Sequence, residues 1–203
     1  MKISYAIPVC TEHAELKELL DFLTSHIDEE DEIVVQCDQG NTTPEVYKVL
    51  NSLNQSYIEF PLKGHFSNFK NNLKEHCTGD WIFQIDADEL PTYFLIKNLK
   101  ELLKLNPTTE MFLVPRVNTV EGLTQEHINQ WRWNVNENGW VNWPDYQTRI
   151  IQNNQKIKWQ NKVHEQIVGI STKSVLPMEE EWSLYHPKDI KKQEHQNNYY
   201  NTL

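Results

Sequence analysis

The strongest chemical signal in this sequence is an apolar run that ends in a cluster of acids. The run Trp81–Ile85 is followed directly by Asp86, Asp88 and Glu89. If the run is a strand, Asp86 and Asp88 face the same side, because residues two apart share one face. Two neighbouring carboxylates repel each other unless a cation separates them. The pattern therefore fits a divalent ion completed by phosphate oxygens and water, although an exposed acidic turn would have the same sequence.

The elements that must position these acids alternate along the first half of the chain. Short apolar strands and amphipathic helices follow one another, which predicts an α/β fold with a mostly parallel sheet. Ligands of such sheets bind at the carboxyl ends of the strands, where Asp86 and Asp88 would lie. We expect Ser67 to cap the third helix. The predicted strands are Ile3–Val9, Glu32–Cys37, Tyr57–Phe60, Trp81–Ile85 and Met111–Val117, and the predicted helices are Ala14–Ser25, Pro44–Leu53, Ser67–His76 and Pro91–Leu105.

The second half of the chain changes character after about Asn118. Gly, Asn and Trp crowd Gln130–Trp143, where we expect an irregular segment. No internal repeat or low-complexity linker marks a boundary, which favours one domain over residues 1–203 with two parts, 1–117 and 118–203. The remaining predicted elements are short strands at Tyr146–Ile151, Ile157–Trp159 and Val163–Ile170 and a polar C-terminal helix at Lys188–Tyr200.

The order of these motifs resembles glycosyltransferase family 2, whose members have the GT-A fold. The resemblance implies a Rossmann-like, mostly parallel sheet with helices on both faces, a UDP-sugar donor and a divalent metal. Residues 1–117 would bind the nucleotide, and the irregular half 118–203 would bind a carbohydrate or another hydroxyl acceptor. The motifs that carry it are Pro8 near the end of the opening strand, Asp38 at the end of the second, Lys70-Asn71 ahead of Gly79-Asp80, and Asp86-Ala87-Asp88.

The same resemblance implies roles on the donor side. The loop with Pro8, Thr11 and Glu12 would frame the nucleotide. Asp38 would accept a hydrogen bond from uracil N3–H, a donor that cytosine lacks. Lys70 could reach a phosphate, although a solvated lysine is an equally good interpretation. The donor-binding residues implied in this way are Pro8, Thr11, Glu12, Asp38, Lys70, Asn71, Asp86, Ala87, Asp88, Arg149 and Lys162.

Signatures in the second half resemble a subgroup of this family and complete an expected metal site. Asp88 would be the direct ligand with Asp86 beside it, and His164 would be the third ligand, with His186 as its rival. Imidazole binds Mn2+ better than Mg2+, which favours Mn2+. Taken alone, a single histidine in a strand is more often a packed or surface residue. The signatures are Pro144–Ile151, Lys158-Trp159, Lys162–Glu165 and Leu184–Pro187.

An inverting transfer also needs a general base that takes the proton of the acceptor hydroxyl. In the family the base is an acid just after the acceptor loop, often followed by an arginine. Asp145, with Arg149 four residues later, matches that placement best. An ordinary Pro-Asp turn is the alternative interpretation of Asp145. Glu165 and Glu89 are weaker candidates for the base.

Tryptophans are concentrated in the second half. Aromatic faces suit the C–H side of a sugar ring, although packing in the core is the commoner use of tryptophan. We expect Trp140 and Trp143 to contact ligand first. The cluster consists of Trp131, Trp133, Trp140, Trp143 and Trp159.

Composition excludes several classes of function. The formal net charge of −10 and the lack of a Lys/Arg stripe argue against a nucleic-acid partner. Cys10, Cys37 and Cys77 are sparse and unpaired in spacing, as expected of free thiols in a reducing compartment. No apolar run has the length of a membrane span. We therefore expect a cytoplasmic protein without integral membrane contact. The sequence is compatible with a homo-oligomer but does not decide the oligomeric state.

Two other classes of protein share part of this pattern. A sugar-nucleotide nucleotidyltransferase would also have paired metal-binding acids, but the loop Pro8–Glu12 has neither the Gly nor the Arg of its signature loop. A catalytically inactive sugar-nucleotide-binding module is the other alternative. The presence of Asp86, Asp88, Asp145 and His164 argues against it.

Overall fold

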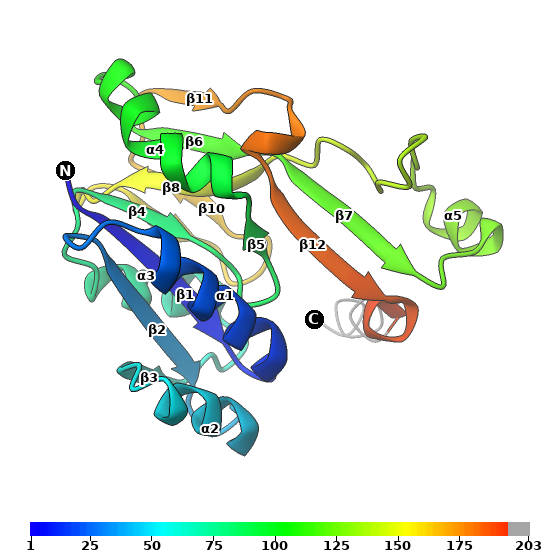
Figure 1. Cartoon of the computed structure of the whole chain (residues 1–203), viewed down its shortest axis with the longest axis horizontal. Coiled ribbons are helices and arrows are strands. Elements are labelled where there is room, and N and C mark those ends of the chain that lie inside the picture. The colour runs from blue at the N-terminus through cyan, green and yellow to red at the C-terminus, as the bar shows by residue number, and fades with distance from the viewer. Residues whose placement is uncertain (195–203) are drawn as a thin grey trace.

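The computed structural model describes residues 1–194 and is built on a central sheet of seven strands (Figure 1). These strands are β1 (Ile3–Val9), β2 (Glu32–Asp38), β3 (Tyr57–Phe60), β4 (Trp81–Gln84), β6 (Met111–Val114), β8 (Gln147–Gln152) and β11 (Lys173–Val175). Their order across the sheet is β11-β6-β8-β4-β1-β2-β3. Strand β8 is antiparallel to both its neighbours, β4 and β6, and the other neighbouring pairs are parallel. The predicted mostly parallel sheet is confirmed.

Helices cover both faces of this sheet, as predicted, because the side chains of β1 alternate between two cores. Tyr5 and Ile7 join the larger core with α1 (His13–His26), α2 (Pro44–Ser52) and α4 (Tyr93–Leu105). Ala6 points the other way and packs with Leu73 of α3 (Phe66–Glu75). Alternation in one buried strand therefore fixes which helix lies on which face.

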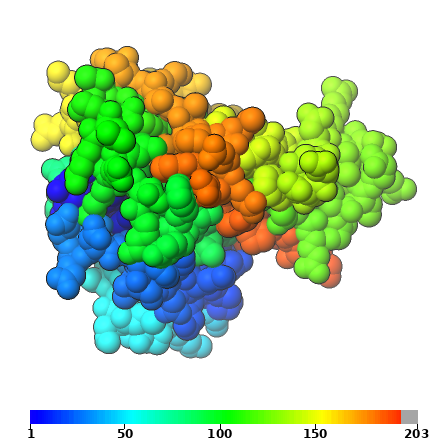
Figure 2. Space-filling model, turned by 45° about the horizontal axis from the view of Figure 1, so that its top comes forward, coloured from blue at the N-terminus to red at the C-terminus, as the bar shows by residue number. Residues whose placement is uncertain are grey.

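A second, three-stranded sheet extends to one side of the central sheet. It has the order β5-β12-β7, from β5 (Leu90–Pro91), β12 (Leu184–Asp189) and β7 (Arg116–Glu121). Strands β12 and β7 are parallel, and His186 is the register partner of Asn118. We call residues 116–143 together with β12 the arm. Helix α5 (Gln125–Trp131) lies at its tip, and Figure 2 shows the arm projecting from the body of the molecule.

A short two-stranded sheet packs against α3. Strands β9 (Lys158–Gln160) and β10 (Gln166–Val168) are antiparallel, and β9 packs against α3. The Asn71 side chain makes this contact specific. Its Nδ2 donates to the Trp159 carbonyl at 2.9 Å, and its Oδ1 accepts from the Trp159 amide at 2.8 Å.

Several predicted element boundaries are wrong, and local chemistry explains why. The predicted strand Met111–Val117 is two strands, because Pro115 has no N–H for a ladder hydrogen bond and the chain changes sheets there. Helix α4 begins at Tyr93 instead of Pro91, because Thr92 caps it by accepting from the Leu95 amide. The expected cap Ser67 lies inside α3, which begins at Phe66, and the cap is His65, whose side chain accepts from the Asn68 amide.

Three further boundaries differ from prediction. The segment Gln130–Trp143 includes the end of α5, and the predicted strand Val163–Ile170 shortens to β10. Lys188 and Asp189 still belong to β12, and residues 190–194 are helical. The rest of the predicted helix, up to Tyr200, lies outside the described residues.

Candidate active site

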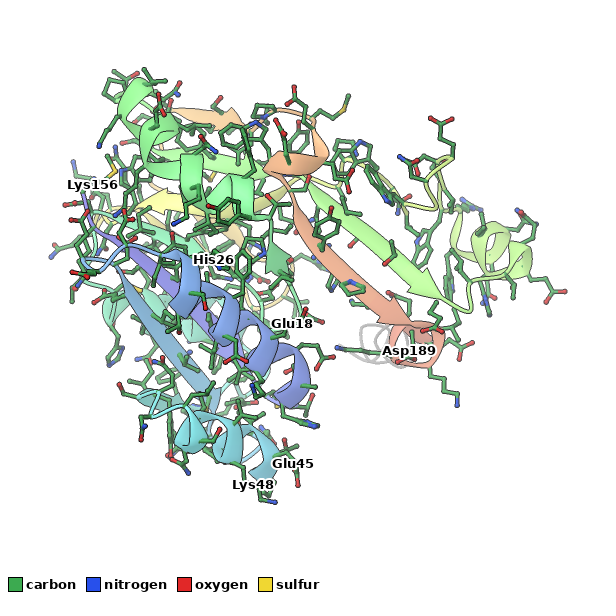
Figure 3. The ribbon with its side chains drawn as sticks, in the orientation of Figure 1. Glu18, His26, Glu45, Lys48, Lys156 and Asp189 are labelled. Carbon is green, nitrogen blue, oxygen red and sulfur yellow. The ribbon has the colours of Figure 1, made fainter. Side chains whose placement is uncertain are left out.

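A pocket of about 670 Å³ lies where the carboxyl ends of β1, β2 and β4 meet the arm. Figure 3 shows the far end of β12, labelled at Asp189, opposite α1, labelled at Glu18. The predicted site residues that line the pocket are Pro8, Glu12, Asp38, Lys70, Asp86, Ala87, Asp88, Asp145, Arg149, Glu165 and His186. Those that do not are Thr11, Asn71, Glu89, Lys162 and His164.

Asp86 and Asp88 lie in the turn after β4 and have different partners. Asp86 Oδ2 accepts from Arg149 Nη2 at 2.5 Å. Asp88 Oδ2 lies 3.4 Å from His186 Nε2 and 3.3 Å from Lys192 Nζ. Burial would raise the pKa of Asp88, but His186, Lys192 and Lys188 outweigh it and lower the pKa. The two acids therefore differ in their partners, since Asp86 is paired with a buried guanidinium and Asp88 with an imidazole and an ammonium group.

Glu89 is the fully buried centre of an ionic network beneath the pocket. Its carboxylate accepts from Arg149 Nε at 2.9 Å and Nη2 at 2.7 Å, and from Arg116 Nη1 at 2.9 Å. Burial would lower the pKa of Arg149, but the charges of Asp86 and Glu89 raise it instead. Glu89 thus orients two guanidinium groups and is not exposed to an acceptor.

Asp145 lies at the foot of the arm and is held by both of its oxygens. Oδ2 accepts from Arg116 Nε at 3.0 Å, Arg116 Nη2 at 2.7 Å and Asn118 Nδ2 at 2.6 Å. Oδ1 accepts from Gln147 Nε2 at 2.9 Å. Burial would raise the pKa of Asp145, but the Arg116 charge and these hydrogen bonds lower it. Asp145 is therefore a fixed carboxylate that is ionised at neutral pH.

Asn118 connects this carboxylate to the histidine beside Asp88. Its Oδ1 lies 2.8 Å from His186 Nδ1, while its Nδ2 donates to Asp145. Arg116 and Asn118 are two apart on β7, so the same face of one strand supplies both partners of Asp145. The alternation Arg116-x-Asn118 is a signal that sequence reasoning missed.

Lys70 of α3 is paired across the pocket. Lys70 Nζ forms an ion pair with Glu165 and lies 4.4 Å from the centroid of the Trp159 ring. A cation over an indole face is attracted by the ring quadrupole. Lys70 is thus neither solvated nor unpartnered, and Glu165 is already engaged by it.

Glu12 and Asp38 hold the loops after β1 and β2 in place through hydrogen bonds. Glu12 Oε2 accepts from the backbone amides of Cys10 and Thr11 at 3.1 and 2.8 Å. Asp38 is buried, and its Oδ1 accepts from the Leu62 amide while its Oδ2 accepts from Asn41 Nδ2, both at 2.9 Å. Both acids line the pocket and fix the loops that shape it.

Of the two candidate histidines, His186 is the one beside Asp88. His164 is exposed with a φ of 52°, and it does not line the pocket. Lys162, two residues earlier, is exposed as well. His186 reaches Asp88 because β12 pairs with β5, whose Leu90 is the register partner of Tyr185, and the sequence signature did not reveal this long-range pairing.

The tryptophans of the arm pack mainly against one another. Trp140 and Trp143 meet nearly edge to face, with ring centroids 4.9 Å apart, and do not line the pocket. Trp133 does line it and packs on Trp131, whose ring stacks on His127. The tryptophan that reaches the pocket is therefore Trp133, and not one of the two expected first.

Comparisons with known proteins agree with this architecture. A model of the family described as Glycosyl transferase family 2 matches residues 4–171. The S. aureus TarS fragment 1–349 in complex with UDP-GlcNAc is similar with a TM-score of 0.64 and 15% identity, over 93% of this chain and 59% of that chain. In complex with UDP, the same fragment gives a TM-score of 0.65 and 15% identity, over 92% and 60%.

A more distant solved structure is glucosyl-3-phosphoglycerate synthase from Mycobacterium tuberculosis in complex with Mn2+, UDP-glucose and phosphoglyceric acid. Its TM-score is 0.47 at 16% identity, over 60% of this chain and 44% of that chain. The present chain thus spans about 60% of the TarS fragment. No curated protein matches the sequence. Residues 1–194 contain no helix that is long and apolar enough to cross a membrane.

Proposed function

The chain belongs to glycosyl transferase family 2, and we propose that it transfers a hexose from a UDP-sugar to an acceptor hydroxyl with inversion at the anomeric carbon. One observation carries the proposal. Asp88 with His186, and Asp145 with Arg116, lie in one pocket at the carboxyl ends of the strands. The first pair suits a metal-bound diphosphate, and the second suits an acceptor hydroxyl.

The donor would lie along the carboxyl ends of β1 and β2. Pro8, Glu12 and Asp38 line that end of the pocket, and Leu62 and Phe66 add apolar surface beside them. The buried Asp38 carboxylate retains acceptor capacity for uracil N3–H, since each oxygen has two lone pairs. The solved TarS structures with UDP and UDP-GlcNAc are related in fold, which supports a uridine nucleotide here.

A divalent metal fits the residues beside β4. A carboxylate and an imidazole, 3.4 Å apart, are oxygen and nitrogen donors that one ion ~2.1 Å from each could share. Within residues 1–194 no three His, Cys, Asp or Glu side chains form such a group, so diphosphate oxygens and water would complete the shell. This donor set favours Mn2+ over Mg2+. When bound, the metal would stabilise the charge of the departing diphosphate.

The remaining residues that we propose for the donor site act mainly through their ion-pair partners. Arg149 holds Asp86 in place, and Lys192, 3.3 Å from Asp88, adds positive charge beside the diphosphate. Arg149 and Lys70 line the pocket and would act on the donor through Asp86 and Glu165, their ion-pair partners. Thr11, Asn71, Lys162 and His164 lie outside the pocket lining. We propose that they act on the donor site only indirectly, Asn71 from α3 and the other three from their loops.

Asp145 would act as the general base. Its carboxylate takes the proton of the acceptor hydroxyl, the hydroxyl oxygen bonds to the anomeric carbon, and the bond from that carbon to the diphosphate breaks. A base must be ionised before the reaction. Because the pKa of Asp145 is lowered in the folded protein, the ionised form is present at neutral pH and is lost only as the pH falls through that lowered pKa.

The test is calorimetric titration of UDP with and without Mn2+. Asp88→Ala should weaken Mn2+-dependent UDP binding by at least about tenfold, or 1.4 kcal/mol, because the direct ligand is lost. Asp21→Ala, which removes an exposed acid paired with Lys17 on α1, is the matched control. Wild-type UDP titrations that do not change when EDTA replaces Mn2+ would contradict a metal-dependent donor site.

A further inference from the structure

We infer that Asn118 is a positioning residue that sets the tautomer of His186 and the orientation of Asp145 with a single side-chain amide. The inference rests on the proposed function, because it concerns a metal ligand and a base. The observation behind it is that one amide bridges two functional side chains from different parts of the chain, at 2.8 Å and 2.6 Å. Neither partner is adjacent to Asn118 in sequence.

The orientation of the amide follows from the chemistry of its partners. An ionised Asp145 can only accept hydrogen bonds, so the NH2 group of Asn118 must face it. The amide oxygen then faces His186, and the contact at 2.8 Å requires a proton on His186 Nδ1. In the neutral ring, the lone pair is consequently on Nε2, the atom 3.4 Å from Asp88 Oδ2. His186 is thus prepared to donate its lone pair to a metal beside Asp88.

Backbone pairing on both sides of Asn118 restrains the position of its side chain. Asn118 is the register partner of His186 across the parallel pairing of β7 and β12. On its other side, the Asn118 carbonyl accepts from the Val141 amide at 2.9 Å. Its side-chain Nδ2 is also 3.4 Å from the Val141 carbonyl. The amide is therefore held between two segments of the arm.

The hydrogen bond from Asn118 also affects how the two oxygens of Asp145 are occupied. Asn118 and Arg116 both donate to Oδ2, whereas among the described residues Oδ1 receives hydrogen bonds from Gln147. Oδ1 therefore keeps a lone pair for the proton of an acceptor hydroxyl. Partners that fix a metal-bound histidine typically contribute a factor of about 10–100 to metal affinity. Asn118 would add such a contribution while it holds the base.

Two variants separate these effects. Asn118→Leu removes the acceptor for His186 Nδ1–H, so the dissociation constant of Mn2+, measured by electron paramagnetic resonance with saturating UDP, should rise about 10–100-fold. Asn118→Asp keeps an acceptor for Nδ1–H but places a carboxylate against Asp145. Its Mn2+ affinity should stay within about threefold of wild type, while kcat falls by at least about tenfold.

The split in Asn118→Asp cannot come from misfolding, because a misfolded site would lose Mn2+ as well. A double-mutant cycle adds a second readout. With His186→Gln already present, Asn118→Leu should raise the Mn2+ dissociation constant by less than about threefold, because the residue through which it acts is gone. Asn129→Leu, which alters an exposed asparagine on α5, is the control and should leave Mn2+ affinity unchanged.

The contrary outcomes are distinct. If Asp88→Ala and His186→Gln weaken Mn2+ binding but Asn118→Leu does not, the role of Asn118 is wrong and the metal site stands. If the effects of Asn118→Leu and His186→Gln add fully, Asn118 does not act through His186. If none of the three variants changes Mn2+ affinity, the proposed metal site itself is overturned.

Discussion

The central sheet and the arm are built in different ways. Strands β1, β2 and β4 are buried in the central sheet and end in the residues that would hold the donor. In residues 116–143, by contrast, the buried hydrophobic side chains are Val117 and Val141. Polar contacts such as Arg116–Glu89 and Asn118–Asp145 join this segment to the rest of the site.

Left-handed backbone conformations occur in both regions, at Asn54 and Lys63 in the first half and near the arm. Arg132, Asn142 and Asp145 have φ values of 56°, 54° and 35°, which non-glycine residues adopt uncommonly. Such conformations persist where surrounding contacts determine them, and they cluster at functional sites. Asp145 is held by Arg116 and Asn118. The comparison suggests that donor binding depends on the packed core and acceptor chemistry on a few polar contacts, so mutations should separate the two.

The largest separation is expected at Asp145. Asp145→Asn keeps the shape of the side chain but cannot take a proton at neutral pH. Turnover of a UDP-hexose should fall by a factor on the order of 10²–10⁴, while UDP-hexose affinity, measured by calorimetry, changes little. A parallel loss of donor affinity would place Asp145 in the donor site and remove the distinction between the two regions.

A smaller effect, on donor affinity instead of turnover, is expected at Asp38. Asp38→Ala should weaken UDP binding by roughly 1.5–3 kcal/mol, because a charge-assisted hydrogen bond to the base is lost. The affinity for CDP, titrated in parallel, should change less. Asp38→Asn is the matched variant, because its amide oxygen can still accept from the Leu62 amide. Full retention of the preference for UDP over CDP in both variants would show that Asp38 does not read uracil.

The smallest effect is expected at Trp133, the tryptophan that lines the pocket from the arm. With a panel of methyl glycosides as acceptors, Trp133→Ala should raise KM by about two- to tenfold, the equivalent of roughly 0.5–1.5 kcal/mol of ring stacking. Hydrolysis of the UDP-hexose without acceptor should not change. Trp182→Ala, which alters a ring that packs on Phe94, controls for general loss of stability. Equal changes in both reactions would assign Trp133 to the donor side.

The sequence predicted the central sheet well because its signals are local. Ile3–Val9 and Tyr57–Phe60 have the bounds that their apolar patterns predict. Asp86 and Asp88 both line the pocket, although a turn places them there and not strand alternation. Buried strands with short connections leave few arrangements for the residues at their ends.

The arm was harder to predict because its contacts join distant residues. Glu89 and Asp145 are 27 residues before and 29 residues after Arg116, their common partner. No local periodicity reports such a pairing. The sequence also could not choose between His164 and His186, since the pairing of β12 with β5, which brings His186 to Asp88, joins distant parts of the chain.

The buried carboxylate of Glu89 has a consequence for protein engineering. It accepts hydrogen bonds from Arg149 of the central sheet and from Arg116 of the arm. The buried negative charge of Glu89 is therefore neutralised by arginines from both regions. A chimera that grafts an arm from another family member would have to retain an arginine at the start of β7. Removing one partner of a buried ionic group typically costs about 3–5 kcal/mol, enough to consume much of the stability of a domain. If the arm binds the acceptor as proposed, its specificity is best altered toward the tip of the arm, beyond the strand that carries this arginine.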